Sequence, residues 1–180
     1  MRTHLLALGT LFSAAFLAAA PARGQVTKED VPGITNFARV ETTVACGGAI
    51  KPEAVAELKQ RGFKAIFDLQ LANERTANIE GEAAAAKAAG ITFVHVPFTP
   101  ATPDTTSVDK FLAEIQKPGN EPAFIHCGGG NRAAGFWVIK RVLVDKWETD
   151  RALKEAQALG LAPGQAMEQF ALDYVKSHKS

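Results

Sequence analysis

Cysteine and an excess of one charge are both scarce in this chain. Only two of its 180 residues are cysteines, Cys46 and Cys127, which excludes a scaffold held together by many disulfides. Lysine and arginine number 20 and aspartate and glutamate number 19, so the formal net charge is +1. No basic stripe is visible either, so the sequence has no field that would hold a polyanion, and we expect no nucleic-acid partner.

Long hydrophobic runs are equally scarce, since the sequence contains one, from Leu5 to Ala20. Arg2 and His4 precede it and small residues around Ala22 follow it, an order typical of a secretory signal peptide. The run is also short for a membrane span, so we expect it to be cleaved. The predicted location is periplasmic or secreted. The predicted organisation is a signal peptide at 1–22, a leader segment without a fold of its own at 23–34 and one domain at 35–180.

Extended and helical segments alternate along the predicted domain. Continuous apolar runs predict strands covered on both faces, at 65–67, 93–96 and 123–125. Apolar residues at helical spacing predict helices at 52–62, 80–89, 107–117 and 133–144, and two more near the C-terminus. Residues 37–40 and 42–46 are predicted to form a hairpin or two edge strands. This order predicts an α/β fold with a central, mainly parallel sheet flanked by helices.

The most informative segment leads from a predicted strand through Cys127 and three glycines to Arg132, near the start of a helix. Ligands of open α/β sheets bind at the carboxyl ends of the strands, which is where Cys127 lies. Successive glycines let N–H groups turn inward, and with the helix N-terminus they form an anion cradle that favours a thiolate. We therefore expect Cys127 to be a nucleophile and Arg132 to grip an oxyanion through its planar fork.

Plainer interpretations of these residues stay open. Cys127 is also explained as a buried structural cysteine before a glycine turn, and His126 as a residue satisfied within its strand or orienting the loop. Cys46 is either a small buried residue or a resolving thiol that forms a reversible disulfide with Cys127. The histidines have no ligand spacing with cysteines or carboxylates, so the sequence predicts no metal site and no cofactor.

The stretch from His126-Cys127 to Arg132 resembles the signature of cysteine-dependent protein tyrosine and dual-specificity phosphatases. From roughly Thr35 to Leu161, the chain is similar to a bacterial phosphatase-like family whose members occur fused to beta-lactamase-fold hydrolases or are related to the phosphatase fused to NAD kinase. The resemblance implies the cysteine phosphatase fold and attack of Cys127 on phosphorus. It also implies that the phosphate oxygens are bound by Arg132 and by the loop, at Gly128, Gly129, Gly130, Asn131 and Ala133.

Three features depart from that signature. Four residues separate Cys127 from Arg132, where phosphatases have five, and four is the number seen in many rhodanese-type sulfurtransferases. Ala133 supplies no hydroxyl after the arginine. No Trp-Pro-Asp-like acid loop is present, so the candidates for the general acid are Asp104, which is equally explained as a cap of the following helix, and Asp68. Glu74 and Arg75 line the rim of the site or belong to a solvated loop.

These observations predict an exported, cysteine-dependent, phosphatase-like hydrolase that cleaves phosphate monoesters through a thiophosphoryl intermediate on Cys127. Two alternatives stay open: a rhodanese-like sulfurtransferase with a persulfide on Cys127, and a catalytically weak module that binds oxyanions or phosphorylated ligands. The expected partner is a phosphorylated small molecule or a phosphoprotein. We expect no membrane partner after cleavage, and the sequence does not indicate an oligomeric state.

Overall fold

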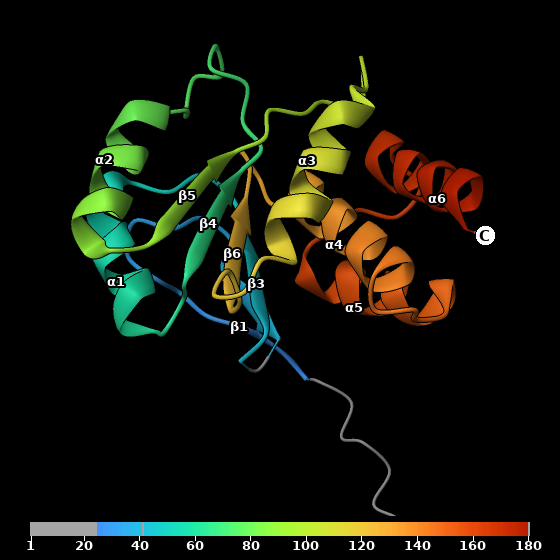
Figure 1. Ribbon diagram of the computed structural model, residues 1–180, viewed down its shortest axis with the longest axis horizontal. Coiled ribbons are helices and arrows are strands. Elements are labelled where there is room, and N and C mark those ends of the chain that lie inside the picture. The colour runs from blue at the N-terminus through green and yellow to red at the C-terminus, as the bar shows by residue number, and fades with distance from the viewer. Residues whose placement is uncertain (1–24, 41, 180) are drawn as a thin grey trace, which may run out of the picture.

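The structure, a computed structural model, describes residues 25–40 and 42–179, so the predicted signal peptide lies outside the described residues. A six-stranded sheet forms its centre, in the order β1-β2-β3-β6-β4-β5 (Figure 1). The strands are β1 Val26–Lys28, β2 Ala38–Val40, β3 Val44–Gly47, β4 Ala65–Asp68, β5 Thr92–His95 and β6 Ala123–His126. Strands β3, β6, β4 and β5 are parallel, whereas β1, β2 and β3 pair antiparallel.

Helices cover both faces of this sheet (Figure 1). The helical segments are η1 Pro52–Ala54, α1 Val55–Gln60, α2 Ile79–Ala89, α3 Thr105–Ile115, α4 Asn131–Leu143, α5 Thr149–Leu159 and α6 Ala166–His178. Helices α1 and α2 lie on one face and α3 to α6 on the other. The α/β fold class is therefore confirmed. Across residues 25–40 and 42–179, no helix combines the length and the apolar character that a membrane span requires.

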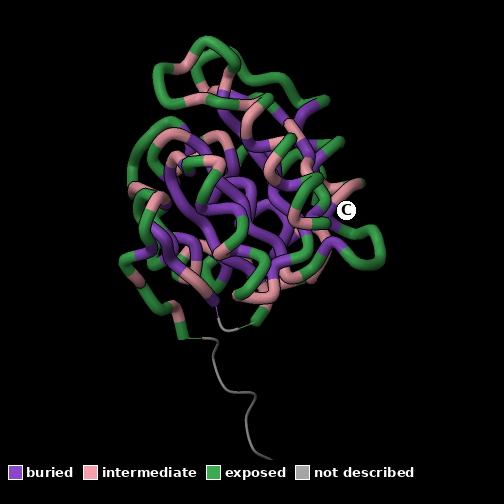
Figure 2. The backbone as a smooth tube through the Cα atoms, turned by 90° about the vertical axis from the view of Figure 1, so that its left-hand side faces the viewer, coloured by how far each residue is buried: buried purple, intermediate pink, exposed green. Residues whose placement is uncertain are grey.

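Two apolar cores fill the space between the sheet and its helices, because successive residues of a strand point to opposite faces. Phe67 and Ile125 pack on the side of α3 to α6, whereas Ile66 and Phe124 pack on the side of α1 and α2. Figure 2 shows the buried chain at the centre and the exposed chain at the periphery. The same alternation places the side chains of His126 and Cys127 on opposite faces of the sheet.

Helix α4 is buried along most of its length, as its nearly continuous apolar sequence predicts. It packs against both α5 and α6. Gly135 faces α6 so closely that an added Cβ would lie 2.5 Å from Cε of Met167. The segment after Cys127 is therefore held within the helical layer.

The predicted hairpin at 37–46 is present as β2 and β3. However, β3 is not an edge strand, because β6 pairs with its other side.

The segment 25–34 belongs to the fold. Strand β1 pairs with β2, with Val26 opposite Val40. Val31 and Ile34 are 1% and 7% exposed and lie in the core beneath α1 and α2. The expectation that this leader has no fold of its own is wrong for its described residues, because its few apolar side chains complete that core and its backbone supplies the edge strand.

Candidate active site

Cys127 follows β6 directly, at the carboxyl end of the parallel part of the sheet. It is 2% exposed and lies on the side of α3 to α6. Its N–H donates to the carbonyl of Gly47 at 3.3 Å, so the contact with β3 continues past the end of the strand. Gly128 to Gly130 then lead into α4, which begins at Asn131. The nucleophile predicted from the sequence thus lies at the edge where ligands of such sheets bind.

The backbone of the glycine loop is oriented by the segments around it. The carbonyl of Gly128 accepts the N–H of Ala49 at 3.1 Å, and the carbonyl of Gly129 accepts Nδ2 of Asn36 at 3.2 Å. In a planar trans peptide the N–H points opposite to the C=O, so the N–H groups of Gly129 and Gly130 point into the hollow of the loop. The N–H of Gly130 donates to Sγ of Cys127 at 3.1 Å. The loop is therefore an anion cradle with the sulfur inside it.

Glycine is required by geometry at two positions around the loop. Gly130 has φ +103°, a backbone conformation that side chains strain. A Cβ on Gly48 would lie 2.9 Å from the carbonyl oxygen of Gly128, so the turn after β3 packs directly against the loop.

The side chains of the two remaining loop residues named by the resemblance contact the rest of the fold. Oδ1 of Asn131 accepts the N–H of Ala162 at 2.8 Å, which ties the loop to the connection between α5 and α6. Ala133 is fully buried in the core.

Arg132 is anchored by three acceptor groups from two other loops. Nη1 donates to Oε1 of Glu74 at 2.6 Å, to the carbonyl of Leu69 at 3.1 Å and to that of Phe98 at 2.8 Å. Nη2 donates to Oε2 of Glu74 at 2.6 Å. A guanidinium has five N–H donors, and no oxygen of the described residues accepts from Nε or from the second hydrogen of Nη2, which share one edge of the fork. The tertiary structure thus presents the edge that a tetrahedral oxyanion requires.

The charges at this anchor support one another. Burial opposes ionisation of Glu74, but the hydrogen bonds from Arg132 and from the N–H of Leu71 lower the pKa of Glu74 below its ordinary value. Burial likewise opposes ionisation of Arg132, but Glu74 and then Cys127 raise the pKa of Arg132 above its ordinary value. The guanidinium lies beside the loop, since an added Cβ on Gly128 would be 3.6 Å from Nη2 of Arg132.

Glu74 is the residue that the sequence left between the rim of the site and a solvated loop. Its alternative as a solvated loop residue is wrong, because its side chain is only 25% exposed and binds Arg132 through both oxygens. Arg75, by contrast, is exposed. No local pattern distinguishes the two neighbours, because the partner of Glu74 lies 58 residues further along the chain.

The structure does not bring Asp104 to the loop. Its carboxylate caps α3, accepting the N–H of Thr106 at 2.9 Å and Oγ1 of Thr106 at 2.7 Å. These bonds, the one from the hydroxyl first, lower the pKa of Asp104 below its ordinary value. A general acid must hold a proton near the leaving group, so the capping role describes Asp104 in this conformation.

Asp68, the other candidate acid, lies on the opposite face of the sheet from Cys127. It is fully buried beside His126, at 3.6 Å between Oδ1 and Nε2, and near Glu82 of α2. Burial, opposed by His126 and by the N–H of Gln70, raises the pKa of Asp68. The suggestion that Asp68 faces the active site is therefore wrong, since side chains one residue apart in a strand diverge. Glu82 was missed, although it shares the inner side of its helix with Ala86, four residues on.

Cys46 lies on the same face as Cys127, in the neighbouring strand. Both thiols are free and buried, and Cys46 pairs in register with Ile125, two residues before Cys127. Burial, and next the charge of Cys127, raises the pKa of Cys46. A disulfide between them stays a prediction.

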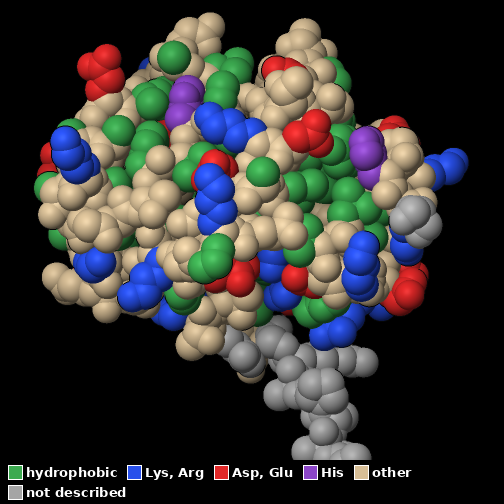
Figure 3. All heavy atoms as spheres, viewed as in Figure 1, with side chains coloured by type: hydrophobic (Ala, Val, Ile, Leu, Met, Phe, Trp, Pro, Cys, Tyr) green, Lys and Arg blue, Asp and Glu red, His purple; other side chains and the backbone are tan. Residues whose placement is uncertain are grey.

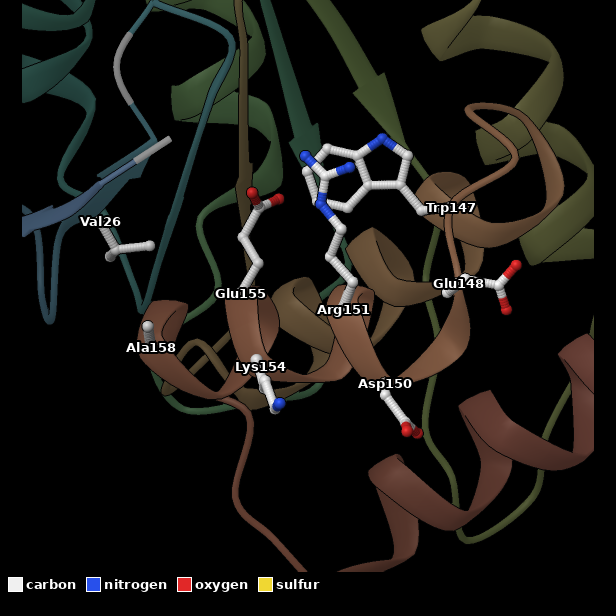
Figure 4. Close-up of a pocket in the computed structure, with 8 residues that line it drawn as sticks. All are labelled: Val26, Trp147, Glu148, Asp150, Arg151, Lys154, Glu155 and Ala158. Carbon is white, nitrogen blue, oxygen red and sulfur yellow. The ribbon is translucent and has the colours of Figure 1, made fainter. Parts of the chain in front are cut away.

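Two of the surface cavities bear on the position of the site. One of about 490 Å³ borders the loop at Gly129 and is also lined by Lys28, Glu29, Asp30, Asn36, Phe37, Ala38, Leu159 and Gly160. Another of about 550 Å³ lies along α5 and includes no residue of 127–132 (Figure 4). There the guanidinium of Arg151 lies over the ring of Trp147, 3.5 Å from its centroid. On the face shown in Figure 3, positive and negative side chains are interspersed. The cavity at Gly129 borders the loop on the side of the Gly129 carbonyl, which faces Asn36, and neither Cys127 nor Arg132 lines it.

Most of the chain matches one known protein family. The family described as DSP-PTPase phosphatase fused to NAD+ Kinase matches residues 21–173. No curated protein matches the chain.

Solved structures share the fold at low sequence identity. A DUF442 phosphatase from Shewanella putrefaciens CN-32 is 17% identical, covers 82% of this chain and 96% of its own, and has a TM-score of 0.66. TpbA from P. aeruginosa is 23% identical over 88% of this chain and 92% of its own, with a TM-score of 0.64, and a cysteine-to-serine form of it was solved in complex with pTyr. The PP-IP phosphatase SIW14 from S. cerevisiae, in complex with citrate, is 20% identical over 78% and 88%, with a TM-score of 0.59. These likenesses confirm the cysteine phosphatase fold.

Proposed function

The chain belongs to the family of DSP-PTPase phosphatases fused to NAD+ kinase, and from that premise we propose that it hydrolyses phosphate monoesters with Cys127 as nucleophile. One observation carries the proposal. The Gly130 N–H donates to Sγ of Cys127, the Gly129 N–H points to the same side of the loop, and Nη2 of Arg132 lies beside the loop at Gly128. These groups stabilise negative charge on the sulfur before the reaction and on the phosphoryl oxygens during it.

The reaction follows from this arrangement in two steps. The Cys127 thiolate attacks phosphorus, an S–P bond forms, the ester P–O bond breaks, and the leaving oxygen takes a proton. Water then attacks phosphorus, the S–P bond breaks, and inorganic phosphate and the thiolate are released. Ala133 offers no hydroxyl to assist departure of the thiolate, so we expect the second step to be slow. The thiophosphoryl intermediate should then accumulate, and the alcohol released in the first step should appear as a burst.

The surroundings of the loop bear on the substrate class. The cavity beside Gly129 has one cationic side chain, Lys28, and two acids, Glu29 and Asp30, and Glu29 is already paired with Arg61. This side of the loop therefore offers little positive charge to a ligand that carries many phosphates. We propose a substrate with one phosphate group, on an aryl ester or on a phosphoprotein segment. The pTyr complex of TpbA supports this class.

A sulfurtransferase is the second candidate, and the length of the loop favours it. Only four residues separate Cys127 from Arg132, as in many rhodanese-type enzymes. In that reaction the thiolate attacks the outer sulfur of thiosulfate, sulfite leaves, and a persulfide forms on Cys127. Cyanide then removes that sulfur as thiocyanate and regenerates the thiolate.

A parallel assay separates these functions. Purified protein is given para-nitrophenyl phosphate in one arm and thiosulfate with cyanide in the other, with Cys127→Ser as the blank. We expect phosphate release that Cys127→Ser lowers by at least about 10³-fold, since serine is nearly isosteric but does not form the anion. Thiocyanate formation alone would establish the sulfurtransferase. Binding of phosphate without turnover in either arm would establish the binding module.

Asp104 supplies the leaving-group proton in this proposal only if residues 99–104 move toward the loop. Aryl phosphates leave as stable anions and need little protonation, so their turnover does not depend on such a movement. A comparison of aryl and alkyl esters therefore tests the acid separately from the nucleophile.

Export is part of the proposal and rests on the sequence of residues 1–22. Fractionation of cells that produce the full chain tests it, together with N-terminal sequencing of the product. Recovery from the periplasm with a new N-terminus near residue 23 supports export. Recovery of the uncut chain in the cytoplasm would contradict it.

A further inference from the structure

Three ionisable side chains meet on the face of the sheet opposite Cys127. Asp68 ends β4, His126 ends β6, and Glu82 projects from the first turns of α2. One donor atom from each lies within 4.8 Å of the others, and all three side chains are 0% exposed. The cluster is therefore closed to bulk water and assembled from segments far apart in the sequence.

Both carboxylates approach the same nitrogen of the histidine. Nε2 of His126 lies 3.1 Å from Oε2 of Glu82 and 3.6 Å from Oδ1 of Asp68. A single N–H would have to be shared between the two carboxylates, and neither contact has the geometry of a hydrogen bond. A histidine that relays protons between two acids would instead use one nitrogen for each. Convergence on a single point is the arrangement of ligands around a cation.

Most of the polar atoms of this cluster have no partner among the described residues. They are Oδ2 of Asp68, both carboxylate oxygens of Glu82, both ring nitrogens of His126 and Oε1 of the neighbouring Gln70. Buried polar groups are nearly always satisfied, and two ionised carboxylates beside a neutral imidazole would carry a buried double negative charge. A divalent cation would neutralise that charge and occupy the convergent atoms together.

We propose that Asp68, Glu82 and His126 bind a divalent transition-metal ion, with Zn²⁺ as the best match. One imidazole nitrogen and two carboxylate oxygens are ligands that Zn²⁺ accepts, whereas Mg²⁺ and Ca²⁺ prefer oxygen alone. Oδ1 of Asp68 also accepts the N–H of Gln70 at 2.8 Å, a bond that orients this carboxylate. Oε1 of Gln70 is the candidate for a fourth ligand.

Such an ion has a structural role at this position. It joins the ends of β4 and β6 to α2, and the peptide after His126 carries Cys127. The spacing of histidines and acids along the chain does not indicate this site, because the three ligands are separated by 14 and 44 residues. The proposal does not depend on the reaction at Cys127, and its test needs no activity.

The test measures metal content and thermal stability. Untagged protein with Cys127→Ser, which keeps the reactive thiol from binding metal, is refolded with Zn²⁺ or with a chelator. We expect about one Zn²⁺ per chain and a higher melting temperature in the first sample. Glu82→Gln should lower the metal content at least about tenfold, whereas Glu80→Gln, an exposed acid of the same helix, should keep it.

The direction of the stability change decides the outcome. With a bound ion, Glu82→Gln lowers the melting temperature; without one, it removes an uncompensated buried charge and raises it. If Glu82→Gln does not fold, the Cys127→Ser protein is titrated with Co²⁺. Co²⁺ bound by these ligands shows visible d–d absorption, and this absorption is lost when Zn²⁺ displaces the ion. Metal content below about one tenth per chain with equal melting temperatures in both samples, or equal metal in Glu82→Gln, would overturn the proposal.

Discussion

The two faces of the sheet at the end of β6 differ in how far their polar groups are hydrogen-bonded. On the Cys127 face, Arg132 donates to two backbone carbonyls and to both oxygens of Glu74, and the loop carbonyls are bonded by Asn36 and Ala49. On the His126 face, six buried polar atoms in the described part of the chain lack a partner. The two residues are adjacent in sequence, so a single step along the strand separates a satisfied polar network from an unsatisfied one.

This difference indicates two kinds of site. The Cys127 face is organised by the protein itself and leaves open only the donors that an oxyanion would take. The His126 face is closed to solvent and requires an added positive charge. Substitution of the donor side chain of Arg132 on the first face should therefore act mainly on turnover, and substitution of the carboxylates on the second face mainly on stability.

Among variants that keep the nucleophile, the largest effect should come from Arg132→Lys. Lysine keeps the positive charge but loses the planar fork that binds Glu74 on one edge and the oxyanion on the other. We expect kcat/KM for an aryl phosphate to fall by about 10²-fold to 10³-fold, with little change in melting temperature. Steady-state kinetics and thermal unfolding measure both. Equal activity would show that Arg132 is only a residue of the helix start.

Glu74→Gln should have the next largest effect. The amide accepts one hydrogen bond but cannot take both from the fork, so Arg132 is held less firmly and kcat falls by about tenfold.

The same variant gives a pH test. Because the pKa of Glu74 in the folded protein lies below the ordinary 4.5, its ionised form stabilises the fold above that pH and the contribution is lost as the pH falls through the lowered value. The melting temperature of the wild type should exceed that of Glu74→Gln at pH 7 and converge with it in acid. A difference that grows in acid would contradict this pairing.

Gly130→Ala should act on stability at the loop itself. Alanine at φ +103° is strained, and we expect a loss of about 1 to 2 kcal/mol in the free energy of unfolding. Gly129→Ala is the matched control, because its Cβ would meet open space and its φ lies outside the strained region. Denaturant unfolding compares the two. An equal loss in both variants would mean that the strain at Gly130 is not specific.

Asp104→Asn should have the smallest effect. Asparagine is as good a helix cap as aspartate, and the carboxylate of Asp104 bonds to Thr106 of α3. We expect kcat for an aryl phosphate to change by less than about threefold. A pH profile of kcat for an alkyl ester checks the alternative: loss of its alkaline limb in the variant would identify Asp104 as the general acid.

Much of the fold could be predicted because the apolar pattern is strong. The continuous runs at 65–67 and 123–125 allow only strands buried on both faces, and they are central strands of the sheet. The least apolar strand, β1, was missed. Its short exposed sequence resembles a loop, and only pairing with β2 makes it a strand.

The candidate site could be predicted where its parts are contiguous. A strand, a cysteine, three glycines and an arginine follow one another directly, and local geometry then brings the sulfur and the loop N–H groups together. Glu74 could not be assigned in this way, because its role depends on the fold bringing the loop after β4 to the start of α4.

The sequence by itself determined the alternation of strands and helices, the position of Cys127 at a strand end and the tight turn that follows it, because each rests on residues close together in the chain. Only the tertiary structure decided which carboxylates are near which cations. In the folded chain, Glu74 binds Arg132. Asp68 lies on the face opposite Cys127, beside Glu82 and His126. Electrostatic interactions act through space over a few ångströms, and the register of the strands and the placement of α2 fix those distances.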